Sequence, residues 1–217
     1  MKRVFGLVEV VFDGIYLLSA LAIGAALIIS HPQDATALTA GLMALILAGG
    51  DAFHLIPRMA SALCRDEERF RAALGRGKLT TSVTMTVFYI ILWRLGLALF
   101  PAPSPGWTEL VYILAAIRIL LCLLPQNRWL ERYPPVRWGV IRNIPFFILG
   151  LICAGLYYIN RGAVPALAGM WLAVVISFAC YLPVVLFSNS NPKVGMLMLP
   201  KTCAYLWMLA MFTSMYF

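Results

Sequence analysis

The sequence predicts an all-α polytopic membrane protein in which residues 1–217 form a single domain of seven transmembrane helices. The first observation behind this prediction is composition. Hydrophobic residues make up 62% of the chain and charged residues 12%, whereas a soluble domain is about half apolar and about a quarter charged. The second observation is a mean hydropathy of +0.88. The third is that the apolar residues form long runs, which leave no room for a separate soluble domain.

Seven segments each contain the roughly 20 mostly apolar residues that a helix needs to cross a bilayer. The gaps between them carry charge or turn-favouring residues, as in "SHPQDAT", "PAPSPGW", "QNRWLERYPPVRW", "NRGAVP" and "NSNPK". A longer gap, "RMASALCRDEERFRAALGRGK", mixes charged and apolar residues and is predicted to form a short interfacial helix. The predicted spans have the approximate bounds 4–30, 36–58, 79–100, 107–125, 140–160, 164–188 and 194–217.

Several spans contain residues that need an explanation in a membrane helix. Glu9 and Asp13 interrupt the first apolar run and no A-x-A-like cleavage site follows, so we interpret this run as a spanning helix. Pro183 and Pro200 are interpreted as helix kinks, which membrane helices tolerate. A faint repeat relates "AFHLIP" to "ACYLP" and "YIILWRLGLALF" to "YLWMLAMF", which fits a three-plus-one-plus-three arrangement of helices.

The basic residues, which give a net charge of +8, fall mostly in alternate loops. The positive-inside rule then predicts a multi-pass protein of the cell membrane with a cytoplasmic N-terminus and an external C-terminus. Basic loops of this kind fit topology control and anionic lipid headgroups, so nucleic acid is not an expected partner. The predicted cytoplasmic loops hold Lys2, Arg3, Arg65, Arg69, Arg71, Arg76, Lys78, Arg128, Arg132, Arg137 and Lys193, and the outer loops hold only Arg161.

The cysteines and histidines do not predict a metal site, and no cofactor is expected. The five cysteines form no CxxC pair, and most lie in apolar runs, where Cys behaves as a small hydrophobe. The chain has two histidines, His31 and His54, and His31 falls in a predicted outer loop. A zinc site built from three histidines, as in alkaline-ceramidase-like membrane hydrolases, is therefore not expected.

Four ionisable residues of the first two spans, Asp51, Glu9, Asp13 and His54, are predicted to act in catalysis. Intramembrane ionisable residues are costly and usually face the bundle interior. Asp51, His54 and Arg58 share one helix face, as do Glu9 and Asp13 on the first span. At about 1.5 Å per residue, these carboxylates lie roughly 9–15 Å from the cytoplasmic boundary. Neighbouring carboxylates disfavour ionisation of both, and such pairs supply acid–base chemistry.

Polar residues of later spans reach a similar depth and are predicted to bind the substrate. Arg118 lies ten residues before Arg128, or about 15 Å deep, and Lys201 lies about 12 Å deep. This agreement between helices predicts a polar cavity that opens toward the cytoplasm. The predicted binding residues are Lys201, Arg118, Arg142, Asn143 and Tyr181.

A structural alternative stays open for the same residues. Ion pairs such as Asp51–Arg58 or Glu9–Lys201 would hold helices together without any catalytic role. Arg58 and Arg142 would extend their side chains to the membrane interface, and Arg58 is interpreted chiefly as such an anchor.

The stretch "GLMALILAGGDAFHLIPR" resembles the YhhN-type lysoplasmalogenase family of polytopic membrane proteins, which carry a Gly-Asp in a context like "GDALxLLPR". The resemblance covers about twenty of the 217 residues. It implies hydrolysis of the vinyl ether bond of a lysoplasmalogen, with Asp51 as an acid–base residue. The family usually has eight spans, a later second Asp and an N-terminal Lys-Pro, none of which has a counterpart here. The residues that carry the resemblance are Gly50, Asp51, Ala52, Leu55, Pro57 and Arg58.

Two functions of different classes stay open beside a purely structural role. As a lipid hydrolase, the protein would use Asp51 and a second carboxylate, Glu9 or Asp13, to protonate carbon and position water. Lys201 or Arg142 would hold the lipid phosphate. As a three-plus-one-plus-three transporter, it would carry a polar or anionic solute through a midplane site. The expected partners are membrane lipids and a lysolipid or a small polar solute, and the sequence does not predict the oligomeric state.

Overall fold

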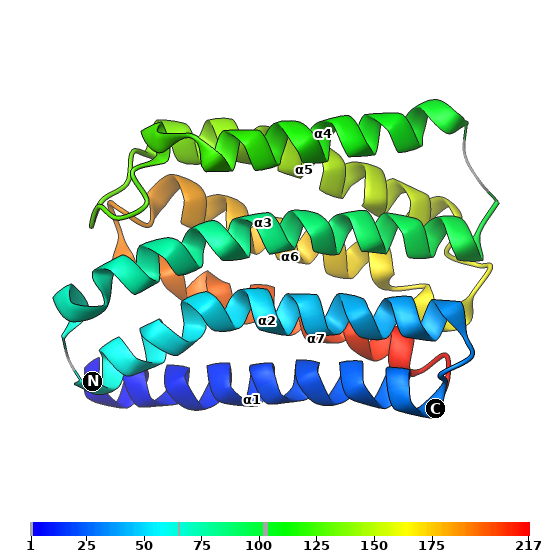
Figure 1. Cartoon of the computed structure of the whole chain (residues 1–217), viewed down its shortest axis with the longest axis horizontal. Coiled ribbons are helices and arrows are strands. Elements are labelled where there is room, and N and C mark those ends of the chain that lie inside the picture. The colour runs from blue at the N-terminus through cyan, green and yellow to red at the C-terminus, as the bar shows by residue number, and fades with distance from the viewer. Residues whose placement is uncertain (1, 65, 102–103) are drawn as a thin grey trace.

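The computed structural model describes residues 2–64, 66–101 and 104–217, and within these ranges the regular structure is entirely helical. Seven long helices lie side by side along the length of the molecule (Figure 1). The predicted all-α, seven-helix fold is therefore confirmed. The helices are α1 (Lys2–Ser30), α2 (Ala35–Cys64), α3 (Glu67–Leu99), α4 (Pro105–Leu123), α5 (Val136–Ile159), α6 (Met170–Phe187) and α7 (Met198–Thr213), with 3₁₀ turns η1 (Pro125–Asn127), η2 (Pro165–Leu167) and η3 (Pro192–Leu197) in the connections.

Each helix packs against the next one in the sequence, and the bundle is completed by contact between α1 and α7. Small residues allow the closest approach. Gly24 and Gly41 face each other between α1 and α2, where a Cβ atom on Gly41 would lie 2.8 Å from the Gly24 carbonyl oxygen. Membrane helices associate through such small-residue contacts because burial of apolar side chains supplies no driving force between helices in lipid.

The two ends of the bundle differ in charge. The α2–α3, α4–α5 and α6–α7 connections share one end with the beginning of α1, and we call it the basic end (Figure 1). At the opposite end, the described loop residues include a single Lys or Arg residue, Arg161. Arg65 and the side chains of Lys2 and Arg3 lie outside the described residues. The basic residues described at the basic end are Arg69, Arg71, Arg76, Lys78, Arg128, Arg132, Arg137 and Lys193.

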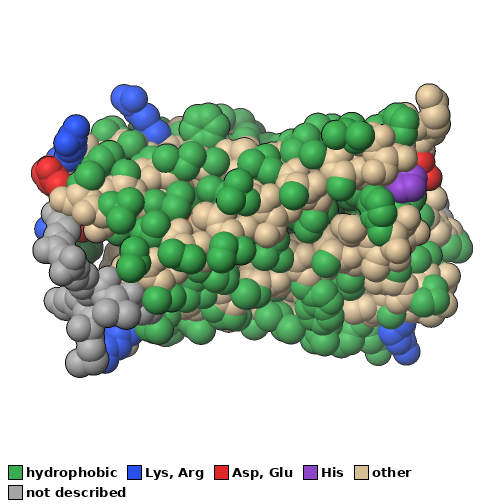
Figure 2. Space-filling view, turned by 90° about the horizontal axis from the view of Figure 1, so that it is seen from below, with side chains coloured by type: hydrophobic (Ala, Val, Ile, Leu, Met, Phe, Trp, Pro, Cys, Tyr) green, Lys and Arg blue, Asp and Glu red, His purple; other side chains and the backbone are tan. Residues whose placement is uncertain are grey.

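All seven long helices are apolar and long enough to cross a membrane. On the face drawn in Figure 2, hydrophobic side chains cover the middle of the bundle and charged side chains lie near its two ends. Large apolar side chains such as Leu18, Ile29 and Leu151 are exposed on the outside of the bundle. The molecule is therefore an integral, multi-pass membrane protein.

The connection between α2 and α3 differs from the prediction. No separate interfacial helix lies between residues 59 and 78 in the part of the chain that the structure describes, because α2 continues to Cys64 and α3 begins at Glu67. Asp66 caps α3 by accepting a hydrogen bond from the Arg69 N–H at 3.0 Å. Two acidic residues in the first turn, Glu67 and Glu68, further favour this helix start. The mixed charged and apolar pattern thus extends two spanning helices beyond the apolar runs.

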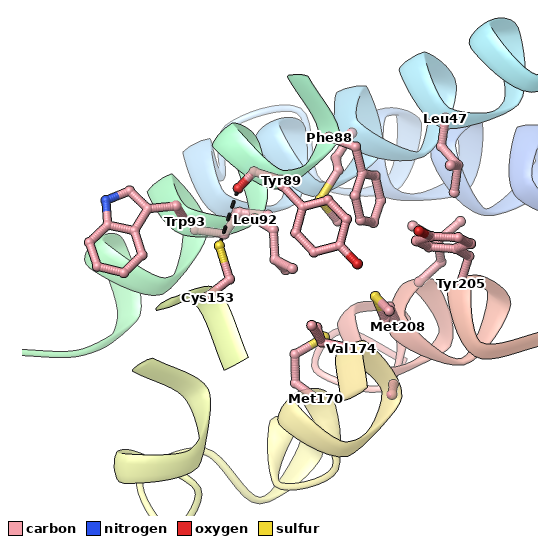
Figure 3. Packing of buried hydrophobic residues seen from close by; sticks show 14 of the residues in the cluster. Leu47, Phe88, Tyr89, Leu92, Trp93, Cys153, Met170, Val174, Tyr205 and Met208 are labelled. Carbon is pink, nitrogen blue, oxygen red and sulfur yellow. Dashed lines mark hydrogen bonds between the residues drawn. The ribbon is translucent and has the colours of Figure 1, made fainter. Parts of the chain in front are cut away.

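The core takes residues from all seven long helices, and Figure 3 shows the part of it to which α2, α3, α5, α6 and α7 contribute. Tyr89 of α3 stands at its centre, and its hydroxyl lies 3.2 Å from the Ser177 hydroxyl of α6. The Tyr157 hydroxyl donates to the Leu92 carbonyl at 3.0 Å, and the Cys153 thiol donates to the Tyr89 carbonyl at 3.6 Å. These bonds between helices satisfy polar groups that would otherwise be unpaired in an apolar interior.

Asp34, in the α1–α2 connection, is expected to contribute a pH-dependent cap to α2. Its carboxylate accepts a hydrogen bond from the Ala37 N–H at 2.8 Å and another from the Tyr216 hydroxyl at 3.0 Å. The Ala37 bond, aided by Tyr216, lowers the pKa of Asp34 from its usual 3.8. Its stabilising effect is therefore present above the unfolded-state pKa and is lost as the pH falls through the folded-state pKa. Asp34→Ala should cost about 1 kcal/mol at pH 7.

The measurement is the thermal midpoint of the purified protein in detergent between pH 7 and about pH 2.5. The difference between wild type and Asp34→Ala should shrink as the pH falls. Asp34→Asn is the matched control, because Asn also caps helices but does not titrate in this range. A difference between wild type and Asp34→Ala that stays constant across this range would contradict the assignment.

Candidate functional site

The predicted catalytic carboxylates of α1 and α2 come together where these two antiparallel helices pack. The Tyr16 hydroxyl donates to Asp51 Oδ2 at 2.6 Å, and Glu9 forms an ion pair with Arg58. Tyr16 and Glu9 are seven residues apart on α1, and their partners are seven residues apart on α2. Seven residues are about two helical turns, so both pairs lie on one stripe between the helices.

Asp13 lies on the same stripe of α1, between Glu9 and Tyr16. Its side chain is buried, with 5% of its surface exposed, and it lies within electrostatic reach of Arg58, Glu9 and Asp51. The three predicted carboxylates thus form one group, the α1–α2 acidic cluster, defined as Glu9, Asp13 and Asp51. The buried ammonium of Lys201 on α7 acts electrostatically on Asp51 and connects this cluster to the rest of the site.

The ion pairing differs from the structural alternative drawn from sequence. Arg58 pairs with Glu9 of α1 and not with Asp51, and Asp51 receives its hydrogen bond from Tyr16. Arg58 is also only partly exposed, with 34% of its side-chain surface accessible. It therefore joins two helices in addition to lying near the basic end, whereas the sequence suggested chiefly an interfacial anchor.

Two contacts hold α3 against α2 beside Asp51. The Thr81 hydroxyl donates to the Gly50 carbonyl at 2.9 Å. Gly50 itself has no room for a side chain, because a Cβ atom there would overlap Thr84. Gly77 is equally constrained, since its Cβ atom would overlap the Phe53 carbonyl and lie 2.7 Å from the His54 Cα. The position of the Asp51 backbone is therefore fixed from the α3 side.

A cavity of about 310 Å³ enters the bundle beside this cluster. Its lining comes from α2 to α7 and from the connections of the basic end, so it lies toward that end of the bundle. Among the described residues that line it, five are Lys or Arg and none is Asp or Glu. Of the predicted site residues, His54, Arg118, Arg142, Tyr181 and Lys201 line it, whereas the three carboxylates of the acidic cluster do not.

Arg142 is held in place at the cavity by two neighbours from the α4–α5 connection. Its Nη1 donates to Asn127 Oδ1 at 2.9 Å, and its guanidinium carbon lies 4.2 Å from the Trp129 ring centre. Asn127 is fully buried, and its amide donates to the Leu121 carbonyl at 2.7 Å and the Leu124 carbonyl at 2.8 Å. The same side chain thus closes the carbonyl end of α4 and orients Arg142.

Arg118 and Lys201 lie deeper and are stacked on aromatic rings. The Arg118 guanidinium carbon is 3.1 Å from the Phe146 ring centre. The Lys201 ammonium is 4.9 Å from the Tyr181 ring centre and 5.0 Å from that of Tyr205, which Figure 3 shows among the core side chains. Cation–π contacts of this kind stabilise charge in a desolvated setting.

Asn143 lies apart from the cavity. Its amide donates to the Gly139 carbonyl at 2.8 Å, and its Oδ1 lies 3.4 Å from the Tyr181 hydroxyl. Asn143 is buried and is not among the residues that line the cavity. Its contact with the Tyr181 hydroxyl orients that side chain, which does line the cavity. Of the predicted binding residues, Asn143 contacts Tyr181, whereas Arg142 contacts Asn127 and Trp129.

Sequence reasoning missed three residues of the cavity region, namely Lys78, Trp129 and Asn127. Lys78 was assigned to a loop because it lies at the edge of an apolar run, and the extended α3 brings it to the cavity. Trp129 and Asn127 lie in "QNRWLERYPPVRW", which has no periodicity. The sequence signal available for these two residues was the presence of an aromatic and an amide side chain among the charged residues of a loop.

The chemistry of the described side chains is that of acids, bases and cations. In the part of the chain that the structure describes, no group of three or more His, Cys, Asp or Glu residues is placed to hold a metal ion. The five cysteines are free thiols. Comparison with protein-family models, curated proteins and solved structures gives no match, so the site is interpreted from its own residues.

Proposed function

We propose that this membrane protein is a lipid hydrolase of the lysoplasmalogenase type, with Asp51 as an acid–base residue. The observation that carries the proposal is the juxtaposition of two unlike regions. The α1–α2 acidic cluster offers carboxylates for proton transfer, and the adjoining cavity offers cations for an anionic headgroup. Lys201 connects the two, because it lines the cavity and acts electrostatically on Asp51. The "GGDAFHLIPR" stretch, with its resemblance to that family, supports the same function.

The basic end is proposed to face the cytoplasm in the cell membrane, as the positive-inside rule predicts. The cavity would then receive its substrate from the cytoplasmic leaflet. A lysolipid placed with its headgroup among the cations would extend its chain into the apolar region of the bilayer. The glycerol separates the phosphate from the vinyl ether, so the proposal requires this bond to extend from the cavity toward Asp51 of the adjoining α1–α2 acidic cluster.

The proposed reaction is hydration of a vinyl ether. A proton from a carboxylic acid adds to the β-carbon, and water that a carboxylate has positioned adds to the α-carbon. The resulting hemiacetal collapses to an aldehyde and an alcohol, so one water is consumed and no redox partner is needed. Asp13 is buried and the neighbouring Asp51 is partly buried, and the acid and base roles are assigned to this pair.

The test of this proposal is turnover by the purified full chain in nanodiscs. A panel of lysoplasmalogens and ester-linked lysolipids is supplied, and release of aldehyde or fatty acid is measured. Product that increases linearly with protein concentration supports the proposal. The absence of product from every lipid in the panel, with correctly folded protein, would contradict it.

A transporter of an anionic solute is the second candidate. It is favoured by one observation, the excess of basic residues in a cavity whose described lining has no carboxylate. Proteoliposomes loaded with a labelled anion would show flux that depends on this protein. The position of the cavity toward the basic end, and not at the middle of the bundle, supports the enzyme more strongly.

A further inference from the structure

The charge in the cavity exceeds what its surroundings neutralise. Arg58, Lys78, Arg118, Arg142 and Lys201 all line it. Among the described residues, Arg58 has an ion-pair partner within 4 Å, Glu9, and Lys201 interacts electrostatically with Asp51. The other three cations have no carboxylate at ion-pair distance in the described part of the chain. Charges inside a membrane protein are costly unless they are paired, so this excess indicates a charged ligand.

Arg118 gives the strongest indication of a polyatomic anion. Only 2% of its surface is exposed, and its Nε and Nη1 atoms have no hydrogen-bond partner among the described residues. Guanidinium N–H groups that lack a protein acceptor are strong donors to the oxygens of a phosphate group. Its stacking on Phe146 fixes the plane of the guanidinium and so directs these donors. Arg118 therefore lines the cavity with a guanidinium whose plane is fixed and whose hydrogen-bonding capacity is only partly used within the described residues.

The aromatic residues of the cavity argue against a zwitterionic headgroup. A choline or ethanolamine ammonium is recognised by aromatic faces or by carboxylates. Here Phe146, Trp129 and Tyr181 each already contact a cation of the protein, namely Arg118, Arg142 and Lys201, respectively. The described lining also contains no Asp or Glu. A second positive charge on the ligand would find no partner and would be repelled.

We propose that the cavity binds a phosphate group with at least two negative charges, that is, a phosphate monoester or a diphosphate. For a lipid substrate, this inference rests on the proposed function and narrows it to vinyl ether lysolipids whose headgroup is a phosphate monoester. The shared chemistry belongs equally to a lipid headgroup and to a free phosphate compound. The cavity volume of about 310 Å³ lies at the small end of the range for ligand pockets, which suits a headgroup of this size.

The experiment measures binding to the purified full chain without any turnover. Isothermal titration in detergent compares inorganic diphosphate, inorganic phosphate and phosphocholine. Native mass spectrometry of nanodisc samples compares dioleoyl phosphatidic acid with dioleoyl phosphatidylcholine. We expect diphosphate to bind at least tenfold more tightly than phosphocholine, phosphatidic acid to be retained preferentially, or both. Retention of the lipid alone identifies a lipid headgroup, and binding of the soluble anion alone identifies a free phosphate compound.

Arg118→Gln and Arg142→Gln should each weaken binding of diphosphate or phosphatidic acid roughly tenfold or more, because each removes a charge-assisted contact. Arg94→Gln is the matched control, since Arg94 is exposed on α3 and is not among the residues that line the cavity. Arg142 is less deeply buried than Arg118. If Arg118→Gln does not fold, the binding affinity of Arg142→Gln therefore provides the test. Equal affinity for phosphocholine, equal weakening by Arg94→Gln, or no binding in either arm would overturn the inference.

The outcomes separate this inference from the proposed function. Selective anion binding without hydrolysis of any lysolipid would leave the inference standing and would contradict the hydrolase. Hydrolysis of lysolipids with no preference for a doubly charged phosphate would support the hydrolase and would contradict the inference.

Discussion

Replacement of Asp51 by asparagine is expected to lower the rate of lysolipid hydrolysis by about 10²–10⁴-fold, the usual contribution of a general acid or base. Asn has nearly the same shape as Asp, and its amide oxygen can still accept the hydrogen bond from the Tyr16 hydroxyl. The variant therefore loses proton transfer while it keeps the α1–α2 contact. The rate of product release in nanodiscs, at saturating and at low substrate, measures the loss.

Two comparisons make the Asp51 result specific. Tyr16→Phe removes the hydrogen bond and leaves the carboxylate, so its rate should fall less than that of Asp51→Asn. Glu109→Gln changes an exposed carboxylate of α4 near the opposite end and should turn over at the wild-type rate. The acid–base role is contradicted if Asp51→Asn retains wild-type turnover and thermal stability.

Gly77→Ala is expected to give the largest loss of stability among single-methyl additions in this molecule. A Cβ atom at residue 77 would overlap the Phe53 carbonyl oxygen and crowd the His54 Cα. Both are backbone atoms of α2, so a change of side-chain rotamer cannot relieve the overlap. Either α2 or α3 must move, and overpacking of this kind costs about 1–3 kcal/mol. Because His54 and Lys78 line the cavity, the same movement should also weaken anion binding.

Gly49→Ala is the matched control for this prediction. Gly49 also lies within a helix, but a Cβ atom there would have no heavy atom within 4 Å. The substitution should leave the thermal midpoint unchanged or raise it, since Ala favours helix over Gly by up to about 1 kcal/mol. Thermal midpoints of both variants in the same detergent provide the measurement. Equal midpoints for Gly77→Ala and wild type would mean that α2 and α3 are not packed as described.

The fold was predictable because hydropathy alone determines which segments can cross a bilayer. The depth of the polar residues was also accessible, since it depends on the rise per residue and the position of the nearest loop. Arg118, Arg142, Lys201 and His54 were placed at one end in this way, and they line one cavity in the structure.

The pairing of residues between helices was not predictable in the same way. It depends on the rotation of each helix about its own axis, which the sequence of a nearly all-apolar helix specifies weakly. Arg58 shares a face of α2 with Asp51, yet it pairs with Glu9, because the antiparallel register of α1 sets that carboxylate opposite it. The partner of Asp51 is a tyrosine, Tyr16, which hydropathy treats as an ordinary interior residue.

The α4–α5 connection was the other part that sequence reasoning could not resolve. Asn127 and Trp129 have no periodic pattern around them, and their roles arise only when the connection folds back over the end of α4. There the Trp129 indole N–H donates to the Cys122 carbonyl at 2.9 Å, and Asn127 meets Arg142 of the next helix. Such contacts depend on tertiary structure and leave no local signature.

The central claim is that the cationic cavity holds the headgroup of the lipid on which Asp51 acts. Inhibition of lysolipid hydrolysis by inorganic diphosphate tests it most directly. Diphosphate would occupy the place of the headgroup and would offer Asp51 no ether bond to cleave. The predicted result is a KM for the lysolipid that rises with diphosphate concentration while kcat stays constant. A KM that stays unchanged when the cavity is saturated with diphosphate would contradict the claim, because headgroup and anion would then bind at separate places.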